Sequence, residues 1–316
     1  MSKLVAICLM GPTASGKSDL SLTIAREFDV EIVNVDATQV YRGMNIGTAK
    51  PDAQTRADFT HHLLDLRNPD EVYSAADFRV DAIKVMNDIV SRGKLPLLVG
   101  GTLFYFSALT RGLSPLPAAD ASIRAKITQE ANARGWAALH SELAEIDSAT
   151  AGKIDPNDAQ RIQRALEIFH LTGIKPSAAK VSTPPKPADF EFVKICYTPS
   201  SRDFLQERIA RRFKIMIEQG FIDEVQKLAN DFALTPELPA ARAVGYRQIL
   251  EYLQAGTEYD AMLSSAITAT RRLAKRQLTW LRRNSGLVWF DAIADSSTAA
   301  VLPYIHGKLT TLGYNQ

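Results

Sequence analysis

The chain has 316 residues, of which 46% are hydrophobic and 23% charged, and its net charge is only +2. These values are typical of a globular protein with a substantial core, and the length predicts one large domain with an insertion, or two domains. No apolar run approaches the roughly 18–20 residues that span a bilayer. Two isolated cysteines, Cys8 and Cys196, form neither a disulfide framework nor a metal-binding spacing, so we expect a cytoplasmic protein without membrane association.

Predicted strands and helices alternate along the first part of the chain. In chain order they are a buried strand at 3–10, a loop at 11–18, a helix from Ser18 to about Phe28, a strand at 31–35, a helix at 77–92, a strand at 95–99 and a helix that ends at Leu109. Such alternation indicates a parallel sheet covered by helices on both faces.

The loop between the first strand and helix matches a phosphate-binding motif. The pattern G-x-x-x-x-G-K-[ST] is complete, with an apolar strand before it and a helix after it. Its glycines let successive N–H groups point inward, and the helix N-terminus favours anions. We expect a diphosphate here, with Lys17 on its terminal phosphates and the Ser18 hydroxyl holding Mg²⁺. The residues expected to bind it are Gly11, Pro12, Thr13, Ala14, Ser15, Gly16, Lys17 and Ser18.

The pattern changes after residue 113, where Asp120 to about Leu171 shows helical spacing and no convincing strand. The proline-containing stretch 177–189 is expected to be a mobile connection, and strands are predicted to return at 191–197 and at Leu287–Phe290. The predicted fold is α/β, with a P-loop-type parallel sheet core interrupted by an all-helical insertion domain. The core is assigned to 1–113 and 190–316, and the insertion to 114–189.

Asp36 is the candidate acidic residue of the site. Phosphate loops usually work with an Asp at the end of a neighbouring strand, but Gly100 stands at that place after the strand at 95–99. Asp36 ends the strand at 31–35, and carboxyl ends of parallel strands line the active-site crevice. Asp36 is therefore predicted to be a metal organiser or a general base, with a turn-capping role as the structural alternative.

Residues 34–51 resemble the stretch that follows the phosphate loop in tRNA dimethylallyltransferases. Further blocks resemble this family in the family's order, namely His61–Asp65, Tyr73–Phe78, Val99–Thr102, Gln160–Glu167, Arg242–Gln248 and Arg271–Gln277. The resemblance runs from about residue 5 to 290, and seven blocks in order are very specific. Two positions depart from the family pattern, which usually has Ser where this chain has Ala37 and Asp where it has Asn45.

The resemblance implies transfer of a dimethylallyl group from its diphosphate to N6 of the adenine just 3′ of the anticodon, in tRNAs that read codons beginning with U. It places the general base at Asp36 and gives Thr13 a contact with the diphosphate. The tRNA contacts that it implies are Asp36, Ala37, Thr38, Gln39, Thr102, Arg124, Gln160, Arg161, Ile162, Gln163, Arg164, Arg242, Gly245, Tyr246 and Arg247. The helical insertion is expected to contact the anticodon arm, and the protein is expected to act as a monomer.

Two groups of basic residues complete the predicted site. Arg208 and Arg212 are four residues apart, so a helix would place both on one face as a second clamp on the diphosphate, with Arg212 in a catalytic role. Residues 271–283 contain six basic residues and no acidic one, and their apolar positions can pack such a helix against the core. The cations Arg271, Arg272, Lys275 and Arg276 would then face RNA phosphates. A solvated helix face is the alternative for both groups.

Other residues of these blocks have less specific roles. A loop base is reachable only when it is flipped out, and Gln39 and Tyr41 are candidates to hold it. His61 and His62 lack a ligand pattern, which favours a structural role.

Three alternative functions stay open at this point. A small-molecule kinase shares the loop and the α/β core, and a prenyltransferase for free adenine nucleotides shares the chemistry. A non-enzymatic RNA-binding module would need only the basic segments. ATP turnover, prenylation of free AMP and RNA binding without turnover distinguish these possibilities.

Overall fold

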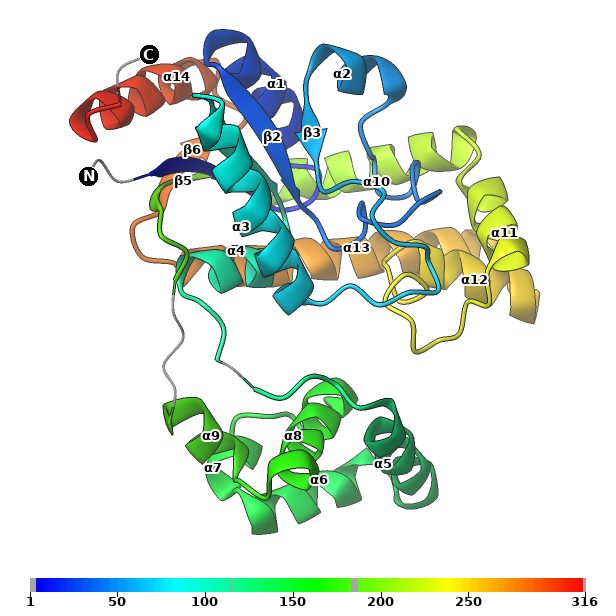
Figure 1. The fold of residues 1–316 in the computed structure, drawn as a ribbon. Coiled ribbons are helices and arrows are strands. Elements are labelled where there is room, and N and C mark those ends of the chain that lie inside the picture. The colour runs from blue at the N-terminus through cyan, green and yellow to red at the C-terminus, as the bar shows by residue number, and fades with distance from the viewer. Residues whose placement is uncertain (1–3, 115, 183–186, 315–316) are drawn as a thin grey trace. The chain divides into compact units, whose positions relative to one another are not determined.

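The computed structural model describes residues 4–114, 116–182 and 187–314. The chain divides into two compact units, a core of Met1–Thr110 with Ala188–Gln316 and a helical unit of Arg111–Pro187 (Figure 1). The insertion expected at 114–189 lies close to these limits. Within the described residues, no helix is both long and apolar enough to cross a lipid bilayer.

The core unit contains a parallel sheet of β1 to β6 in the order β3-β2-β4-β1-β5-β6. The predicted α/β core with a parallel sheet is therefore confirmed. Its elements are β1 (Val5–Met10), α1 (Lys17–Glu27), β2 (Val30–Val35), α2 (Ala53–Asp58), β3 (His61–His62), α3 (Ala75–Ser91), β4 (Leu95–Gly100), α4 (Leu103–Thr110), β5 (Glu191–Thr198), α10 (Arg202–Glu218), α11 (Phe221–Asp231), α12 (Tyr246–Ala255), α13 (Tyr259–Arg282), β6 (Val288–Asp291) and α14 (Asp295–Thr311).

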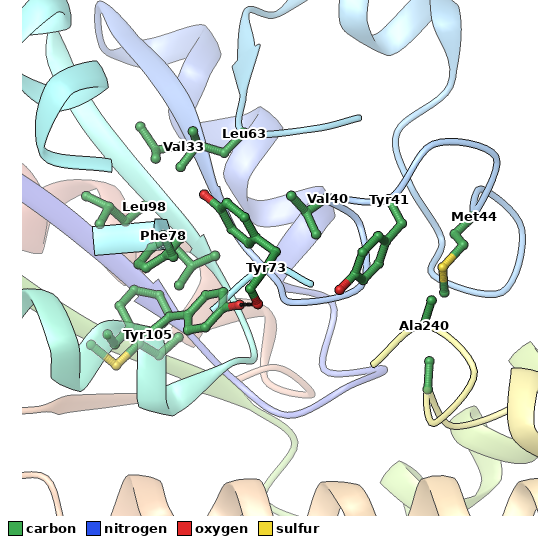
Figure 2. Packing of buried hydrophobic residues seen from close by; sticks show 14 of the residues in the cluster. Val33, Val40, Tyr41, Met44, Leu63, Tyr73, Phe78, Leu98, Tyr105 and Ala240 are labelled. Carbon is green, nitrogen blue, oxygen red and sulfur yellow. Dashed lines mark hydrogen bonds between the residues drawn. The ribbon is translucent and has the colours of Figure 1, made fainter. Parts of the chain in front are cut away.

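The side chains of β1 divide between the two faces of the sheet because successive residues of a strand point in opposite directions. Ala6, Cys8 and Met10 enter a core shared with α3, α4 and the helices α10 to α13. Figure 2 shows the part of this core around Tyr73 and Phe78. The alternate β1 residues enter a second core under α1 and α14. Burial on both faces explains why β1 is a continuous apolar run.

The carboxyl ends of β1, β2 and β4 meet at one edge of the sheet, because the three strands are parallel neighbours. Met10 and Val35 both pair with Gly100 there. A Cβ atom on Gly100 would lie 2.0 Å from the Val35 carbonyl oxygen, so no side chain fits at this position. The close approach of β2 therefore explains why an acidic residue cannot stand at the end of β4.

The two histidines that end the short strand β3 have structural partners. The His62 ring Nε2 lies 2.7 Å from the Glu31 carboxylate, and the His61 ring Nδ1 lies 2.7 Å from the Phe59 carbonyl oxygen. No group of three or more potential metal ligands among His, Cys, Asp and Glu occurs in the described residues. These contacts agree with the structural role that the sequence favours.

The helical unit consists of helices wherever the structure describes a regular element. They are α5 (Ala121–Arg134), α6 (Trp136–Ile146), α7 (Ser148–Ala151), α8 (Ala159–Thr172) and α9 (Pro176–Ser182). Ile127, Leu139 and Leu143 form part of its own hydrophobic core. Residues 177–182, which were predicted to belong to a mobile connection, form α9 instead, because Pro176 is tolerated at the first position of the helix and the prolines at 184, 185 and 187 come after its end. Residues 183–186 lie outside the described residues.

Candidate active site

The phosphate loop curls tightly between β1 and α1. Ala14 and Gly16 adopt left-handed backbone angles, with φ of 61° and 93°. Pro12 has no N–H, Thr13 donates its N–H to Gln277 at 2.9 Å, and the Ser15 N–H donates to the Pro12 carbonyl oxygen at 3.3 Å. Within the described chain, the N–H groups between Thr13 and Ser18 that donate to no protein acceptor are those of Ala14, Gly16, Lys17 and Ser18.

The residues of the phosphate loop therefore differ in what they offer to a ligand. Pro12 and Ser15 are buried and do not line the cavity, whereas Ala14 is buried but lines it. Ser15 Oγ has no hydrogen-bond partner in the described chain. The four free N–H groups lie at the turn and at the N-terminus of α1, where the helix dipole also favours negative charge. This part of the loop is suited to bind an anion.

Three cations surround the same loop. Lys17 donates to the Pro12 carbonyl oxygen at 3.1 Å, and the Arg208 guanidinium lies 3.5 Å from the place where a Cβ on Gly16 would stand. Arg212, one helical turn after Arg208 on α10, lines the same cavity as Lys17. None of the three forms an ion pair with a carboxylate within the described residues. The predicted clamp on one face of α10 is thus directed toward the loop, not toward solvent alone.

The mutual repulsion of these cations appears in their pKa values. Burial, and to a smaller extent Arg212, lower the pKa of Lys17 from 10.5 to about 8, while Asp36 opposes the change. Burial also lowers the pKa of Arg212, again opposed by Asp36. Bringing positive groups together without a counterion costs free energy, which a bound polyanion would recover.

Asp36 follows β2 and faces the same cavity as Lys17. Its Oδ1 accepts hydrogen bonds from the Thr38 N–H at 2.9 Å and from the Thr38 hydroxyl at 2.6 Å. In the described chain, Oδ2 accepts none. The carboxylate is therefore oriented through one oxygen, while the other oxygen is available to a substrate.

Thr102 fixes the turn after Asp36. Its hydroxyl oxygen accepts the Ala37 N–H at 3.0 Å, and its own N–H donates to the Val35 carbonyl oxygen at 3.2 Å. The residue before α4 therefore holds the end of β2 and lies close to Asp36; the tRNA contact that the resemblance implies for Thr102 stays a prediction.

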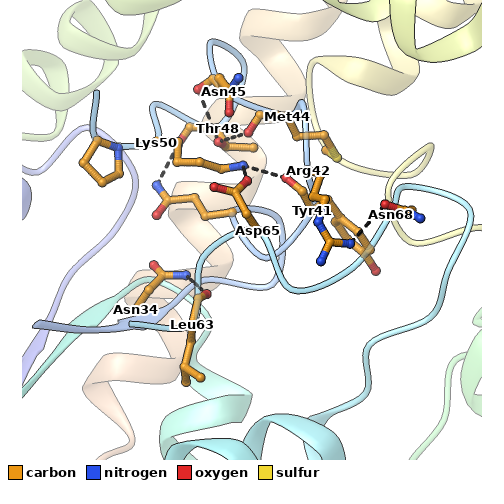
Figure 3. A network of polar contacts seen from close by, with 12 residues as sticks. Asn34, Tyr41, Arg42, Met44, Asn45, Thr48, Lys50, Leu63, Asp65 and Asn68 are labelled. Carbon is orange, nitrogen blue, oxygen red and sulfur yellow. Dashed lines mark hydrogen bonds and ion pairs between the residues drawn. The ribbon is translucent and has the colours of Figure 1, made fainter. Parts of the chain in front are cut away.

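The loop from residue 37 to 51 is held by buried polar contacts. Lys50 donates to the Tyr41 carbonyl oxygen at 2.6 Å and pairs with Asp65 at 2.7 Å (Figure 3). Glu224 accepts the N–H groups of residues 45, 46 and 47 at 3.0, 2.7 and 3.2 Å, and the Tyr246 hydroxyl at 2.6 Å. A carboxylate that accepts four hydrogen bonds is a strong anchor. This loop is a fixed wall of the site.

A cavity of about 1700 Å³ joins these groups inside the core unit. Lys17, Ser18 and Asp36 line it together with side chains of α10 and α13. Its apolar wall includes Ile209, Phe213 and Met216 from α10. The cavity is large enough for a diphosphate ester together with a nucleobase.

Gln277 is a site residue whose role could not be found from the sequence. Its Oε1 accepts the Thr13 N–H, and its Nε2 donates to the Gly101 carbonyl oxygen, each at 2.9 Å. One amide thus connects α13 to the phosphate loop and to the turn after β4. A glutamine within a basic helix carries no sequence signal for such a role, since only the fold brings residue 277 to residue 13.

The basic face of α13 is exposed as predicted. Ala274 and Leu281 are buried, and Leu278 packs against the core. The exposed residues are Arg271, Arg272, Lys275, Arg276, Arg282 and Arg283. Arg276 also lines the cavity, so the cationic surface continues to its opening.

Other predicted RNA contacts separate into available and unavailable side chains. Arg242, Arg247, Gln160 and Arg161 are exposed, and Arg242 also lines the cavity. Gln39 faces the cavity but donates its amide to the carbonyl oxygens of residues 48 and 49.

Three predicted contacts are wrong because their side chains are buried. Tyr41 is 0% exposed, Ile162 is 0% exposed in the core of the helical unit, and Tyr246 is 2% exposed with its ring 4.8 Å from that of Phe221. Gly245 is also buried. Tyr41, Ile162 and Tyr246 are therefore not RNA contacts, since a side chain packed in a core cannot touch RNA. Gly245 has no side chain, so its contact stays a prediction.

Two arginines of the helical unit, Arg124 and Arg164, share one buried carboxylate. Glu167 is fully buried and accepts hydrogen bonds from Arg124 at 2.8 Å and from Arg164 at 2.6 Å. Burial alone would raise the pKa of Glu167, but its hydrogen bonds to both arginines hold it below its ordinary value. Gln163 donates to the Arg124 carbonyl oxygen at 3.3 Å. This cluster orients both guanidinium groups, each of which stays partly exposed.

The chain is similar to known proteins over nearly its whole length. Residues 39–284 match the family model described as IPP transferase. A protein named tRNA dimethylallyltransferase from Thiobacillus denitrificans is 50% identical over 303 residues, which is 95% of this chain and 96% of that protein. A relative of the same name from Burkholderia thailandensis is 51% identical over 92% of this chain and 91% of its own.

Two solved structures share the fold. The tRNA isopentenylpyrophosphate transferase from Bacillus halodurans has a TM-score of 0.72 and 36% identity, covering 99% of this chain and 98% of its own. A eukaryotic dimethylallyltransferase described as acting on tRNA has a TM-score of 0.76 and 27% identity, covering 96% of this chain and 77% of its own.

Proposed function

The chain belongs to the IPP transferase family, and from this premise we propose that it transfers a dimethylallyl group from dimethylallyl diphosphate to a tRNA. The acceptor is N6 of the adenine just 3′ of the anticodon, in tRNAs that read codons beginning with U. The observation that carries the proposal is one cavity lined by Lys17, Ser18, Arg212 and Asp36. Arg208 lies beside the adjoining loop at Gly16, and none of the three cations forms an ion pair with a carboxylate within the described residues. The positively charged groups suit a diphosphate, and the Asp36 carboxylate suits a group that gives up a proton.

Asp36 acts as the general base in the proposed reaction. The N6 lone pair is delocalised into the ring, so loss of an N6 proton helps it attack carbon. The nitrogen–carbon bond forms, the allylic carbon–oxygen bond breaks with its electron pair leaving on diphosphate, and Asp36 Oδ2 receives the proton. Thr38 supports this role by holding Oδ1 through two hydrogen bonds.

The loop and α10 stabilise the departing diphosphate. Negative charge develops on it as the carbon–oxygen bond breaks, and preorganised positive groups stabilise such charge most where water is excluded. Lys17, Arg208, Arg212 and the free N–H groups supply this environment. The apolar side chains of Ile209 and Met216 suit the five-carbon chain.

Mg²⁺ fits the proposed site as a partner of the diphosphate. Ser18 is exposed at the start of α1 and offers its hydroxyl, and Mg²⁺ takes its other ligands from phosphate oxygens and water. This agrees with the lack of a preformed cluster of protein ligands in the described residues. When bound, the ion supplies further positive charge to the leaving group.

The RNA is proposed to bind along α13 and the helical unit. The exposed arginines of α13 face phosphates, and Arg161, Arg124 and Arg164 of the helical unit contact the anticodon arm. Phosphate contacts fix position without reading sequence. We further propose that the protein works as a monomer in the cytoplasm.

The first experiment uses purified protein, Mg²⁺, labelled dimethylallyl diphosphate and bulk tRNA. Asp36→Asn keeps an oxygen for Thr38 but removes the base, so turnover is expected to fall about 10²–10⁴-fold while tRNA binding persists. Asp70→Asn, at an exposed position, serves as the matched control. Full activity of Asp36→Asn would exclude Asp36 as the base.

Parallel reactions with AMP and with ATP alone test the alternatives. Label in AMP but not in tRNA would support a prenyltransferase for free nucleotides. ATP consumption without label transfer would support a kinase, and RNA binding without any turnover would support a binding module. Each of these results would contradict the proposed function.

A further inference from the structure

Two large aromatic side chains lie exposed at the opening of the active-site cavity. Phe104 at the start of α4 is 52% exposed, and Trp280 near the end of α13 is 44% exposed. Their ring centroids are 6.5 Å apart at an interplanar angle of 80°. Both side chains also line the cavity that contains Lys17 and Asp36.

The helices that carry the pair are fixed to the catalytic groups. Phe104 lies two residues after Thr102, which accepts the Ala37 N–H next to Asp36. Trp280 lies three residues, about one helical turn, after Gln277, which accepts the Thr13 N–H of the phosphate loop. The pair therefore has a defined position relative to both substrates.

The surroundings of the pair select a nucleobase as its occupant. Arg276 precedes Trp280 by about one turn, is exposed and lines the same cavity, and Arg283 follows it on the surface. Aromatic rings between cations are the usual composition of single-stranded RNA sites, where bases stack and phosphates pair with arginine. A prenyl chain needs a buried apolar wall, which α10 supplies inside the cavity.

We propose that Phe104 and Trp280 form a stacking site for a base of the substrate RNA other than the adenine that reacts. The reacting base must reach Asp36, whereas both rings are about half exposed at the opening. Stacking of a neighbouring base there would hold the loop open and keep the target base directed inward. The inference rests on the proposed function, because it assumes an RNA loop at this opening.

Intrinsic fluorescence provides a direct test. A variant with Trp136→Phe and Trp289→Phe leaves Trp280 as the only tryptophan. Its emission is expected to be quenched by an anticodon stem-loop RNA in which the target position is abasic, since another base stacks. No quenching by this RNA, or equal quenching by dimethylallyl diphosphate alone, would overturn the proposal.

Kinetics with side-chain variants give a second test. Phe104→Ala and Trp280→Ala are each expected to raise KM for tRNA about tenfold, with KM for dimethylallyl diphosphate unchanged. Phe104→Tyr and Trp280→Phe keep an aromatic face and are expected to restore most of the affinity, whereas Phe104→Leu keeps apolar volume but not stacking. Equal behaviour of Phe104→Leu and Phe104→Tyr would contradict stacking.

The binding test is independent of catalysis. RNA-dependent quenching without label transfer to tRNA would leave the stacking site supported and the proposed reaction refuted. Label transfer to tRNA with no quenching and no effect of the alanine variants would support the proposed reaction and refute the stacking site. Circular dichroism of each variant checks folding, which exposed positions should not disturb.

Discussion

Binding of dimethylallyl diphosphate is expected to weaken as pH rises above 8. Burial, with a smaller effect of Arg212, lowers the pKa of Lys17 from 10.5 to about 8, so the free protein loses this positive charge above that pH. A bound diphosphate would favour the protonated amine and raise the pKa again. At a pH between the Lys17 pKa of the free protein and that of the complex, the ligand binds only those molecules in which Lys17 is protonated.

The size of the effect follows from that fraction. With a pKa of about 8, roughly half of the Lys17 amines are protonated at pH 8 and about a tenth at pH 9. The apparent Kd should therefore rise about fivefold between pH 8 and pH 9, and about tenfold over the following pH unit. Binding should also take up a proton, to an extent that increases from about 0.5 per site at pH 8.

Isothermal titration of dimethylallyl diphosphate, without RNA, in buffers of different ionisation enthalpy measures both quantities. The terminal phosphate of such a ligand ionises near pH 6, so it contributes little above pH 8. Lys17→Arg is the matched control, because its guanidinium stays charged and its affinity should not change with pH. A flat Kd between pH 7 and pH 10 in the unmodified protein would refute the reasoning, as would equal heats in all buffers.

Three further predictions follow from single contacts. Gln277→Leu removes two hydrogen bonds to the phosphate loop and its neighbour and should raise KM for dimethylallyl diphosphate about tenfold with little change in tRNA affinity; an unchanged KM would exclude a positioning role. Glu224→Gln loses acceptors for the loop at residues 45–47 and should lower the free energy of unfolding by about 2–4 kcal/mol in denaturant titration, whereas the exposed neighbour Asp223→Asn should not. Glu167→Gln should destabilise the helical unit by about 1–3 kcal/mol and weaken RNA binding, because Arg124 loses its partner; unchanged amide exchange in α8 would contradict this.

Most of the sheet was predictable because its central strands are rich in apolar residues. β1 and β4 are buried on both faces and appear as apolar runs, so their positions follow from the sequence. β5 is buried mainly in its second half and includes Glu191 and Lys194, but its β-branched and aromatic residues still indicate a strand. β3 consists of two histidines and pairs with β2 at only two positions, so it has no pattern of its own. Its formation depends on tertiary contacts that a sequence does not display.

The candidate site was predictable where chemistry determines residue type. Lys17, Asp36 and Arg212 line one cavity, as their positions after strands and on a helix predicted. Ile162 shows the limit of transferring a block by resemblance. It shares helical spacing with Ala165 and Leu166, which is typical of a buried helix face, and the structure places it in the core of the helical unit. For Ile162, the helical spacing of apolar residues therefore predicts the direction of the side chain better than its position in a family motif does.

The two departures from the family pattern leave the site intact because main-chain atoms form the contacts there. The Ala37 N–H donates to the Thr102 hydroxyl, and the Asn45 N–H donates to Glu224. Any residue except proline supplies these donors, so the loss of a hydroxyl at 37 or of a carboxylate at 45 breaks neither bond. At position 45 an amide has a further physical advantage, since a carboxylate there would add like charge close to Glu224. The residues that cannot vary are instead the acceptors, Thr102 and Glu224, because each must present a side-chain oxygen at a fixed distance from the backbone.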